Sequence, residues 1–563
     1  GSMGAVTISS QNLTNSGTVS AQNDTLSVTS DSVNNNGGLA GTRVTINAND
    51  INNTGSHAFV LAKEKFEIVS TGGLNNTDGG VFYSLGDGEF DVAGILTNSS
   101  ATIETHNDLT IKASKVSNRK RAFSASESVS SQAYNNVGIG VPGGYYQASR
   151  SYTQTTTTPY IATDSPQAYL LSGGDMTITG AIDSLYSTVS AVGNLNFTAS
   201  QLNNQFYRAN KTIVSSGVDT LYRNETYCKR KVGGHCISER QRTKIDTRGY
   251  NNTSASTVTL ASSTFTAGGN ITGKVGFVDN KGKVGFVDNK GKVGEVEKAI
   301  ASKDPLPSAS DEGNDNTLTA RHNDIFKNVV DDLILSALYG LSTTPNPPFL
   351  IETNPLLTNY QYFISSDYLL NKLTSDAAGR NGKVAVRLGD GFLEQKLVRD
   401  QILSYTGFQT LPDETDIEAM YALLMNNAVD SYEDLGLSTG IELSAAQIEQ
   451  LQQPIVWMVT ETVDTPNGPQ QALVPKVYFS AASGLVLRPD GALIAATNIN
   501  IDAQEGITNS GSMLATADLS LKGRSIDNAG TVKAGGNASL TATSDITNSG
   551  TMQAGVRLGY RWR

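Results

Sequence analysis

The same short phrase recurs along this chain about every 20 residues. Each copy has an apolar residue, then Asn or similar polar residues, and in most copies a glycine. The copies begin at Leu13, Val33, Ile51, Leu74, Leu96, Ile507, Ile526 and Ile546. Such a period is typical of a solenoid, in which one repeat cannot bury its apolar face alone and must stack on its neighbour. The sequence therefore predicts a rod of stacked coils.

Between these phrases, apolar and small polar residues alternate, as at Leu26 and Val28 or at Val44 and Ile46. Alternation with period two indicates short strands with one buried face. We expect Asn and Gly at the corners, because both tolerate left-handed backbone conformations, and ladders of Thr, Ser and Asn on the outside. The predicted fold is mainly β: a right-handed parallel β-helix with loop and hairpin insertions and an α-helical insertion domain.

Composition limits what the chain can do. Lys and Arg number 42 against 53 Asp and Glu, a formal net charge of −11, which disfavours nucleic-acid binding. No apolar run reaches about 18 residues, so we expect no membrane span. The opening Gly1–Met3 resembles the remnant of a removed tag, and no signal peptide is visible, so we expect an excised fragment.

Catalytic and cofactor signatures are scarce. The string G-x-G-x-x-G beginning at Gly138 lies in a Gly- and Pro-containing loop with no helix after it, unlike a dinucleotide site. The four histidines have no plausible nucleophile or metal partner nearby. We therefore expect no enzyme, no cofactor and no metal site; a polysaccharide-cleaving β-helix is the least favoured alternative.

The repeat is interrupted, and insertions in repeat proteins project from one face, which is often the binding face. We expect a tag remnant at residues 1–3, β-helix coils at 4–115, a Tyr-rich insertion at 116–169, coils at 170–204, a basic Cys-containing insertion at 205–255, a coil and nine-residue repeats at 256–300, a linker at 301–320, an α-helical insertion at 321–453, a β-hairpin at 454–495, coils at 496–556 and a tail at 557–563.

Three features define the second half. The string G-K-V-G-F-V-D-N-K occurs at 273–281 and again at 282–290, which suggests a small hairpin stack. A strand pair around the P-N-G sequence at 466–468 predicts a hairpin. Helical faces are predicted by Ile325, Val329, Leu333 and Ala337, by Leu393, Leu397, Val398 and Ile402, and by Ile417, Met420, Leu424 and Ala428, with Asp367, Asp413 and Ser444 as N-caps. We interpret these apolar faces as core in preference to a partner groove.

Cys228 and Cys236 are the only cysteines. Two thiols this close, in a chain otherwise free of cysteine, are best explained by one disulfide that closes a short loop in an oxidising compartment. The alternative is a pair of free thiols. A zinc site with His235 is disfavoured, because structural zinc needs four ligands.

Residues 205–250 are unusually basic, with ten Lys and Arg against four Asp and Glu and with interleaved tyrosines. Tyr and Arg are the residues that most often anchor interfaces, and the charge predicts an anionic partner. The alternatives are a solvated loop whose charges keep it soluble and, for the earlier tyrosines, a small core inside their own insertion. The candidate receptor-binding residues are Tyr207, Tyr222, Arg223, Tyr227, Lys229, Arg230, Lys231, Arg240, Arg242, Tyr145, Tyr146 and Tyr152.

The Asn-Gly coils, together with N-P-L-L-T-N-Y-Q-Y-F-I-S-S-D-Y-L-L at 354–370 and G-D-G-F-L-E-Q-K-L-V-R-D-Q at 389–401, resemble the filamentous haemagglutinin-type exoproteins. More narrowly, they resemble the central region of the CdiA family of bacterial contact-dependent growth inhibition. The resemblance covers nearly the whole chain, and the two blocks are more specific than the coils.

The resemblance implies a secreted β-helical filament that is attached to the outer membrane of the producing bacterium. It also implies a receptor-binding region that grips an outer-membrane protein or lipopolysaccharide of a neighbouring bacterium to allow toxin delivery. We expect a monomer without toxic activity of its own.

Two other functions stay open: a structural spacer and a host-directed adhesin segment. Binding requires the insertions at 116–165 and 205–255 to meet on one face or at one tip, and this condition separates a binder from a spacer.

Overall fold

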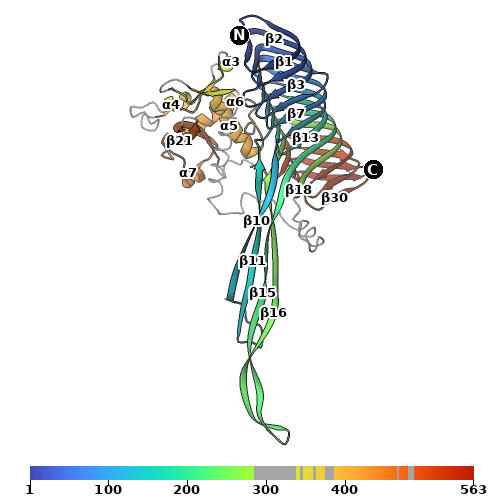
Figure 1. Ribbon diagram of the computed structural model, residues 1–563, viewed down its shortest axis with the longest axis vertical. Helices are drawn as coiled ribbons and strands as arrows, with labels where there is room; N and C mark the ends of the chain where they lie inside the picture. The colour runs from blue at the N-terminus through green and yellow to red at the C-terminus, as the bar shows by residue number, and fades with distance from the viewer. Residues whose placement is uncertain are drawn as a thin grey trace.

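The computed structural model describes residues 1–284, 338–342, 347–358, 363–373, 386–465, 468–479 and 487–562. Most of it is a stack of parallel coils with the two termini at opposite ends (Figure 1). The strands that contribute to the coils are β1 (Val6–Asn15), β2 (Thr18–Asn35), β3 (Gly38–Thr54), β4 (Phe59–Ser70), β5 (Leu74–Thr77), β6 (Val81–Ser84), β7 (Asp87–Ser99), β8 (Thr102–Thr105), β9 (Leu109–Arg119), β12 (Tyr169–Ser172), β13 (Met176–Leu185), β14 (Thr188–Ala191), β15 (Leu195–Val232), β17 (Ser263–Ala267), β18 (Asn270–Val284), β23 (Ala492–Ala496), β24 (Asn498–Asn509), β25 (Ser512–Ala515), β26 (Leu519–Gly523), β27 (Ile526–Asn528), β28 (Thr531–Ala534), β29 (Asn537–Ala542), β30 (Ile546–Asn548), β31 (Thr551–Ala554) and β32 (Arg557–Trp562). The predicted mainly β fold, a parallel solenoid, is confirmed.

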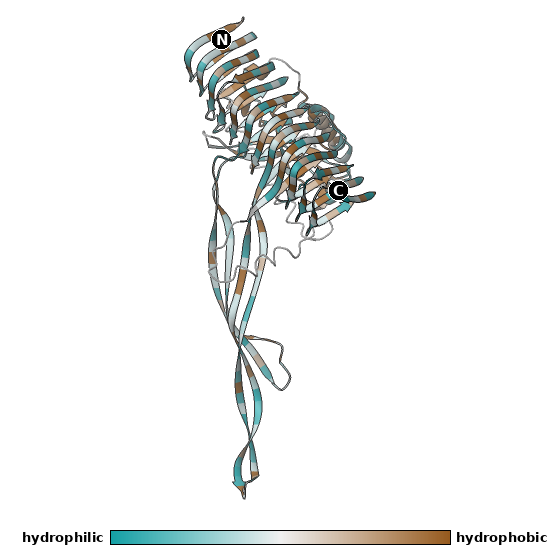
Figure 2. Cartoon of the chain, turned by 90° about the vertical axis from the view of Figure 1, so that its right-hand side faces the viewer, coloured by the Kyte–Doolittle hydropathy of each residue, from teal (hydrophilic) through white to brown (hydrophobic). Residues whose placement is uncertain are grey.

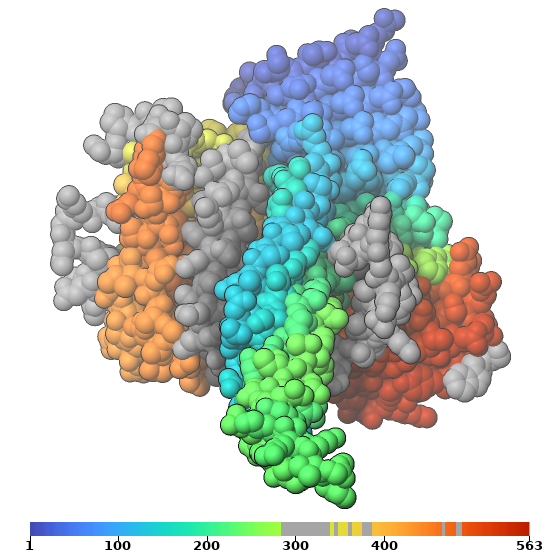
Figure 3. Space-filling view, turned by 60° about the horizontal axis from the view of Figure 1, so that its bottom comes forward, coloured from blue at the N-terminus to red at the C-terminus, as the bar shows by residue number. Residues whose placement is uncertain are grey.

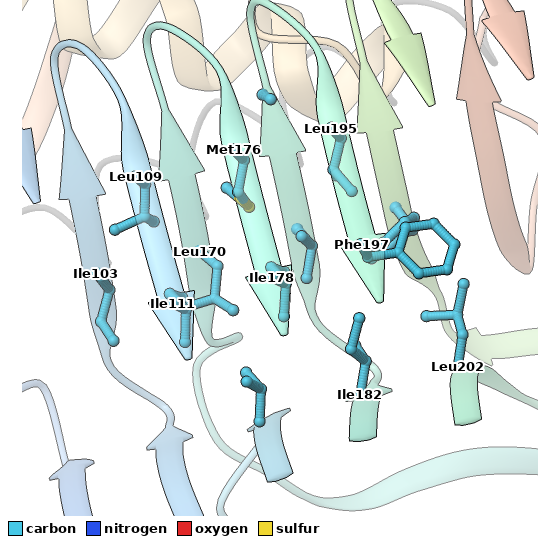
Figure 4. Packing of buried hydrophobic residues seen from close by; sticks show 14 of the residues in the cluster. Ile103, Leu109, Ile111, Leu170, Met176, Ile178, Ile182, Leu195, Phe197 and Leu202 are labelled. Atoms are coloured by element: carbon cyan, nitrogen blue, oxygen red, sulfur yellow. The ribbon is translucent and has the colours of Figure 1, made fainter. Parts of the chain in front are cut away.

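The core is a column of apolar side chains inside the coils. Leu109, Met176 and Leu195 occupy equivalent positions on three successive coils and stack along the axis (Figure 4). All three are completely buried. Because burying one such side chain contributes about 1.5–3 kcal/mol, each coil is stabilised mainly by its neighbours.

In most copies of the phrase one asparagine lies inside the solenoid, which corrects in part the expectation of ladders on the outside; a ladder through Asn34, Asn52 and Asn75 does run along the outside. Asn35, for example, is 1 % exposed and donates to the side-chain oxygen of Asn53 at 2.7 Å. One ladder runs through Asn15, Asn35, Asn53, Asn76, Asn98 and Asn118, and a second through Asn204, Asn280, Asn509, Asn528 and Asn548. None of these residues has a positive φ, so the amide, and not left-handed backbone, explains the preference for Asn.

The glycine of the phrase has a different role. A Cβ atom added at Gly37 would lie 2.1 Å from the carbonyl oxygen of Gly17 on the preceding coil, and Gly530 has the same relation to Gly511. At Gly37 and Gly530 glycine is therefore needed because successive coils approach closely, whereas Gly55 has a φ of +103°, the left-handed conformation expected from the sequence.

The first copy of the nine-residue repeat, 273–281, is part of a coil, so the predicted hairpin stack is wrong for it. It lies in β18, which pairs in parallel with β15 on one side and β24 on the other. Asn280, from its D-N-K sequence, belongs to the buried ladder. The second copy lies largely outside the described residues.

Between β18 and β23 the chain forms a second unit of mixed α and β structure. It contains β19 (Tyr339–Leu341), β20 (Ile351–Thr353), α3 (Pro355–Thr358), α4 (Asp367–Lys372), α5 (Gly391–Thr406), α6 (Ile417–Ser431), α7 (Ala445–Gln450), β21 (Ile455–Thr465) and β22 (Gly468–Tyr478). The predicted hairpin, β21 with β22, is confirmed. The expectation of an α-helical insertion is corrected, because the hairpin shares one core with the helices, in which Met420 and Leu424 pack with Trp457. The predicted linker at 301–320 and the helical face from Ile325 to Ala337 lie outside the described residues.

The predicted caps are partly right. Ser444 caps α7 in a reciprocal arrangement with Gln447. Helix α6 is capped by Asp416 and not by Asp413, because Asp416 is the residue whose carboxylate accepts from the first-turn amides, at Ala419. Asp367 is the first residue of α4 and not its cap.

The second unit packs against one face of the coil stack (Figure 1). Arg399 of α5 pairs with Glu104 of β8, and both side chains are 5 % exposed. Burial by itself would raise the pKa of Glu104, but the Arg399 charge opposes it and the pKa falls to about 2. Nearby, Gln409 donates hydrogen bonds of 3.0 Å to the carbonyls of Ser172 and Ser190. This unit therefore covers the coil face instead of extending the stack.

Candidate functional site

The two insertions of the first half form one antiparallel sheet that projects from the side of the solenoid (Figures 1 and 2). Its strand order is β10 (Phe123–Gly138), β11 (Gln147–Asp164), β15 and β16 (His235–Ala261). We call residues 123–164 and 207–261 the arm. The first insertion meets the second where β11 pairs with β15, from Gln147 opposite Tyr222 to Thr157 opposite Thr212. The two insertions therefore meet in one sheet, as binding through both of them would require.

The arm continues directly from a coil. The first part of β15 pairs in parallel with β13 and β18 as a coil strand, and the same strand then runs outward into the arm. At the base, the rings of Phe123, Tyr186 and Tyr207 pack together, with Phe123 centroids 4.8 Å and 5.3 Å from the other two. Tyr207, a sequence candidate for recognition, is therefore an anchor of the base and lies away from the free end.

Strand alternation gives the arm two unlike faces, because residues directly opposite each other in an antiparallel pair share a face. One, the charged face, carries Tyr134, Arg150, Tyr152, Asp219, Arg223, Glu225, Tyr227, Arg240, Arg242, Lys244, Asp246, Arg248 and Tyr250. On the other face, no charged residue occurs between Thr212 and Thr226 of β15 or among their partners on β16, from Gln241 to Ala255. The sequence therefore directs its basic residues to one side.

Asp219 is the centre of the charged face. Its side chain is 1 % exposed and lies directly between Arg150 of β11 and Arg248 of β16. Arg150 donates to it at 2.6 Å and Arg248 at 2.8 Å. The hydrogen bond from Arg150 is the main reason that the pKa of Asp219 is lowered. One carboxylate thus joins strands from both insertions.

A row of tyrosines crosses the same face. Tyr134 and Tyr152 stack with ring centroids 4.8 Å apart, and Tyr152 meets Tyr250 at 5.7 Å across the intervening strand. The intervening residue is Gly217, where an added Cβ would lie 2.6 Å from the Cβ of Tyr152. The same Cβ would lie 2.1 Å from the carbonyl oxygen of Ser151, so glycine is needed here because the backbones of β11 and β15 approach closely.

Further out, most charges are paired within the arm. Arg223 pairs with Asp246 at 2.9 Å and Arg242 with Glu225 at 2.9 Å. Tyr145 donates to Asp246 on the charged side, whereas Tyr146 contacts Tyr222 on the other side. Arg223 and Arg242 are therefore already occupied, and the predicted recognition tyrosines are divided between two faces.

The end of the arm, residues 228–240, differs from the rest, and we call it the tip. Only the second insertion reaches it, as Figure 3 shows when the arm is seen from its free end. Cys228 and Cys236 form a disulfide, with Cα atoms 5.6 Å apart, and Gly233 and Gly234 make the turn with φ of +57° and +87°. Both glycines suit a two-residue hairpin turn, which requires positive φ.

Four cations of the tip form no ion pair with any residue that the structure describes: Lys229, Arg230, Lys231 and Arg240. All four are exposed. The only acidic residue of the tip is Glu239. Of the basic residues singled out from the sequence, these four are the ones available to an external anion.

Sequence reasoning missed Arg150, Asp219, Arg248 and Tyr250 as parts of one cluster. The usable signal was an isolated Asp in a basic segment. This signal was not sufficient, because the sequence around Asp219 does not show which arginines lie opposite its side chain.

The described part of the chain contains no group of three His, Cys, Asp or Glu side chains placed to hold a metal ion. Among the described helices, none has the length and apolar character needed to cross a membrane.

Comparison with known proteins identifies relatives of one kind. The chain is 41 % identical over 212 residues to "tRNA nuclease CdiA-2" of Burkholderia pseudomallei (strain 1026b), a match that covers 37 % of this chain and 6 % of the relative. It is 27 % identical over 503 residues to "Toxin CdiA" of Yersinia pestis, covering 81 % of this chain and 14 % of the relative, and 33 % identical over 212 residues to "Toxin CdiA" of Escherichia coli, covering 37 % and 6 %.

The chain thus spans only a small part of the length of these curated relatives. No family model matches the sequence, and no solved structure matches the fold.

Proposed function

Because this chain is a CdiA-type protein, we propose that its arm recognises an outer-membrane molecule on a neighbouring bacterium while the coils present the arm. The supporting observation is the joining of both insertions into one projecting sheet, which ends in cations that form no ion pair with the described residues. A spacer would need neither the projection nor the Asp219 cluster. Burying the Asp219 carboxylate costs free energy of folding, which a spacer has no reason to spend.

The filament would stand on the surface of the producing cell as a monomer, with the arm reaching sideways from its axis. The target would be a barrel protein or a lipopolysaccharide, since both can offer carboxylate or phosphate groups to the tip. Recognition would then allow a toxin to be delivered from elsewhere in a longer protein.

We further propose that the chain has no enzymatic activity. Nuclease activity is named for relatives of which this chain spans only 6 %. The clusters of polar residues in the arm are used in ion pairs between strands, and Asp219 is buried beneath two arginines. These polar side chains would stabilise the arm and bind its target.

The test is binding of the fluorescently labelled chain to outer-membrane vesicles from susceptible and resistant bacteria. In the decisive variant, residues 224–243 are replaced by Asn-Gly, because Arg223 and Lys244 are directly opposite and can be joined by a two-residue turn. We expect the variant to fold and to lose binding at least tenfold.

The matched control leaves the arm unchanged and reverses charge on the coils, with Lys274→Glu and Lys533→Glu. We expect it to bind like the parent chain. Equal binding by the shortened variant would refute recognition through the tip, and binding to host cells in place of bacteria would favour the adhesin alternative.

A further inference from the structure

The cations of the arm fall into two groups. Along the arm, Arg150, Arg223, Arg242 and Arg248 each pair with a carboxylate of a neighbouring strand. At the tip, Lys229, Arg230, Lys231 and Arg240 have no such partner among the described residues. Opposite charges on adjacent strands can pair, but the tip has only one acidic residue, Glu239. The net positive charge of the arm is therefore concentrated at its free end.

The tip also exposes its apolar residues. Val232 is 55 % exposed beside the Gly-Gly turn, and Ile237 is 54 % exposed on the returning strand. Single exposed apolar residues are common on proteins, but here both lie at the outermost end, next to the free cations. An apolar end bordered by Lys and Arg is the arrangement that partitions into the interface of an anionic lipid layer.

The dimensions of the tip favour lipid over protein as the partner. A stable protein interface buries roughly 800 Å² on each side. The tip is a two-stranded hairpin without the neighbouring β10 and β11, so it is narrow. A lipid layer adapts to a narrow shape, and each Lys or Arg near an anionic surface strengthens binding about fivefold.

We propose that the tip, through Val232 and Ile237 and the four cations around them, inserts into the interface of a lipid layer with anionic headgroups. This inference rests on the proposed function and names the class of molecule that the arm contacts first. The disulfide would hold the hairpin closed, so that the apolar residues stay at the end.

The test is flotation of the full chain with vesicles of phosphatidylcholine alone or with about one third phosphatidylglycerol. We expect binding only to the anionic vesicles, at least about tenfold stronger at low than at high salt. Lys229→Glu, Arg230→Glu and Lys231→Glu together should abolish it, whereas Lys112→Glu, Lys274→Glu and Lys533→Glu, the same charge change on the coils, should leave it intact.

A second pair of variants tests insertion. Val232→Ser with Ile237→Ser should weaken binding about tenfold and leave its salt dependence unchanged, because the charges remain. Val214→Ser with Val218→Ser, an equivalent change on exposed residues of the arm's uncharged face, should have no effect.

Two outcomes overturn the inference: no binding to anionic vesicles, or equal binding of the triple tip variant and the parent chain. If the chain binds outer-membrane vesicles but not pure lipid, and protease treatment of those vesicles removes binding, the proposed function stands and the partner is a protein. If it binds neither, the proposed function fails as well.

Discussion

Arg150 and Asp219 come from different insertions, yet the Arg150 Nε atom lies 2.6 Å from Asp219 Oδ1 at the centre of the arm. Arg248 reaches the same carboxylate from the other side. This contact joins two insertions that are separated along the chain by the coil strands β12, β13 and β14. At this point of the arm, a single carboxylate holds arginines of two neighbouring strands.

Asp219→Asn should therefore loosen the arm without affecting the coils. Removing the carboxylate breaks charge-assisted hydrogen bonds that contribute about 1.5–3 kcal/mol, and it leaves Arg150 and Arg248 facing each other. Water around Arg248, whose side chain is 59 % exposed, limits the cost. Hydrogen exchange should rise in β11 and in the part of β15 that lies in the arm, residues 207–232, and stay unchanged in β13. The control Asp502→Asn, in an exposed pair with Lys522, should cost less than about 1 kcal/mol.

The same contact predicts a pH effect. The pKa of Asp219 is lowered in the folded arm, so its contribution is fully present above the unfolded pKa of roughly 4 and is lost as pH falls through the folded value. Protection of β11 from hydrogen exchange should decrease in acid in the parent chain and be independent of pH over that range in Asp219→Asn. An unchanged acid response in the variant would mean that another group is responsible.

Replacing Cys228 and Cys236 by Ser should affect only the tip. Closing so short a loop contributes roughly 2–3 kcal/mol by limiting the open chain. Hydrogen exchange should increase within residues 228–240, while the melting temperature of the solenoid stays the same. Intact-mass analysis of the parent chain should find no alkylatable thiol before reduction.

Asn98→Ala should destabilise the solenoid itself. The Asn98 amide donates to Asn118 at 2.9 Å and to the Tyr169 carbonyl at 2.9 Å, in a site with no access to water. Each buried polar group left unpaired costs about 1–3 kcal/mol, so the loss should be several kcal/mol and visible in the urea midpoint. Asn52→Ala, in the half-buried outer ladder, should cost much less.

Because of Glu394, the second unit should be more stable in mild acid than at neutral pH. Burial raises its pKa to about 7, despite hydrogen bonds from Ser366. An acid with a raised folded pKa favours folding when protonated, so stability should fall as pH rises from roughly 4.5 to 7, by roughly 3 kcal/mol. Thermal unfolding of Glu394→Gln should lack this dependence, and a flat profile in the parent chain would contradict the assignment.

Several particular residues show why sequence reasoning succeeded or failed. Met420 and Leu424 were placed on a buried face correctly, because the helical period is a local property. The sequence predicts Asp413 as the cap of the helix that begins at Ile417, but Asp416 caps it, because the path of the chain decides which Asp faces the first-turn amides. Asn280 was assigned to a hairpin turn because its partners, Asn204 and Asn509, are far away in the sequence.

The candidate site was only partly accessible in the same way. The basic segment and the tyrosines were visible from composition, but Arg223 and Arg242 proved to be paired internally and Tyr207 to lie at the base. Which cations remain free depends on which strands are neighbours. Arg223 and Arg242 face their partners only once the register of β15 with β16 is fixed.

The sequence by itself determined the coils, because a repeat that buries one face must stack and each contact is made with the next repeat. The tertiary structure alone decided how the insertions join, since β11 and β15 pair over runs rich in Ser and Thr that would fit several registers. The observed register is the one that opposes Asp219 to Arg150 and leaves Gly217 beneath Tyr152. Charge pairing and close backbone contact between distant segments, which no local period encodes, thus decided how the two insertions form one arm.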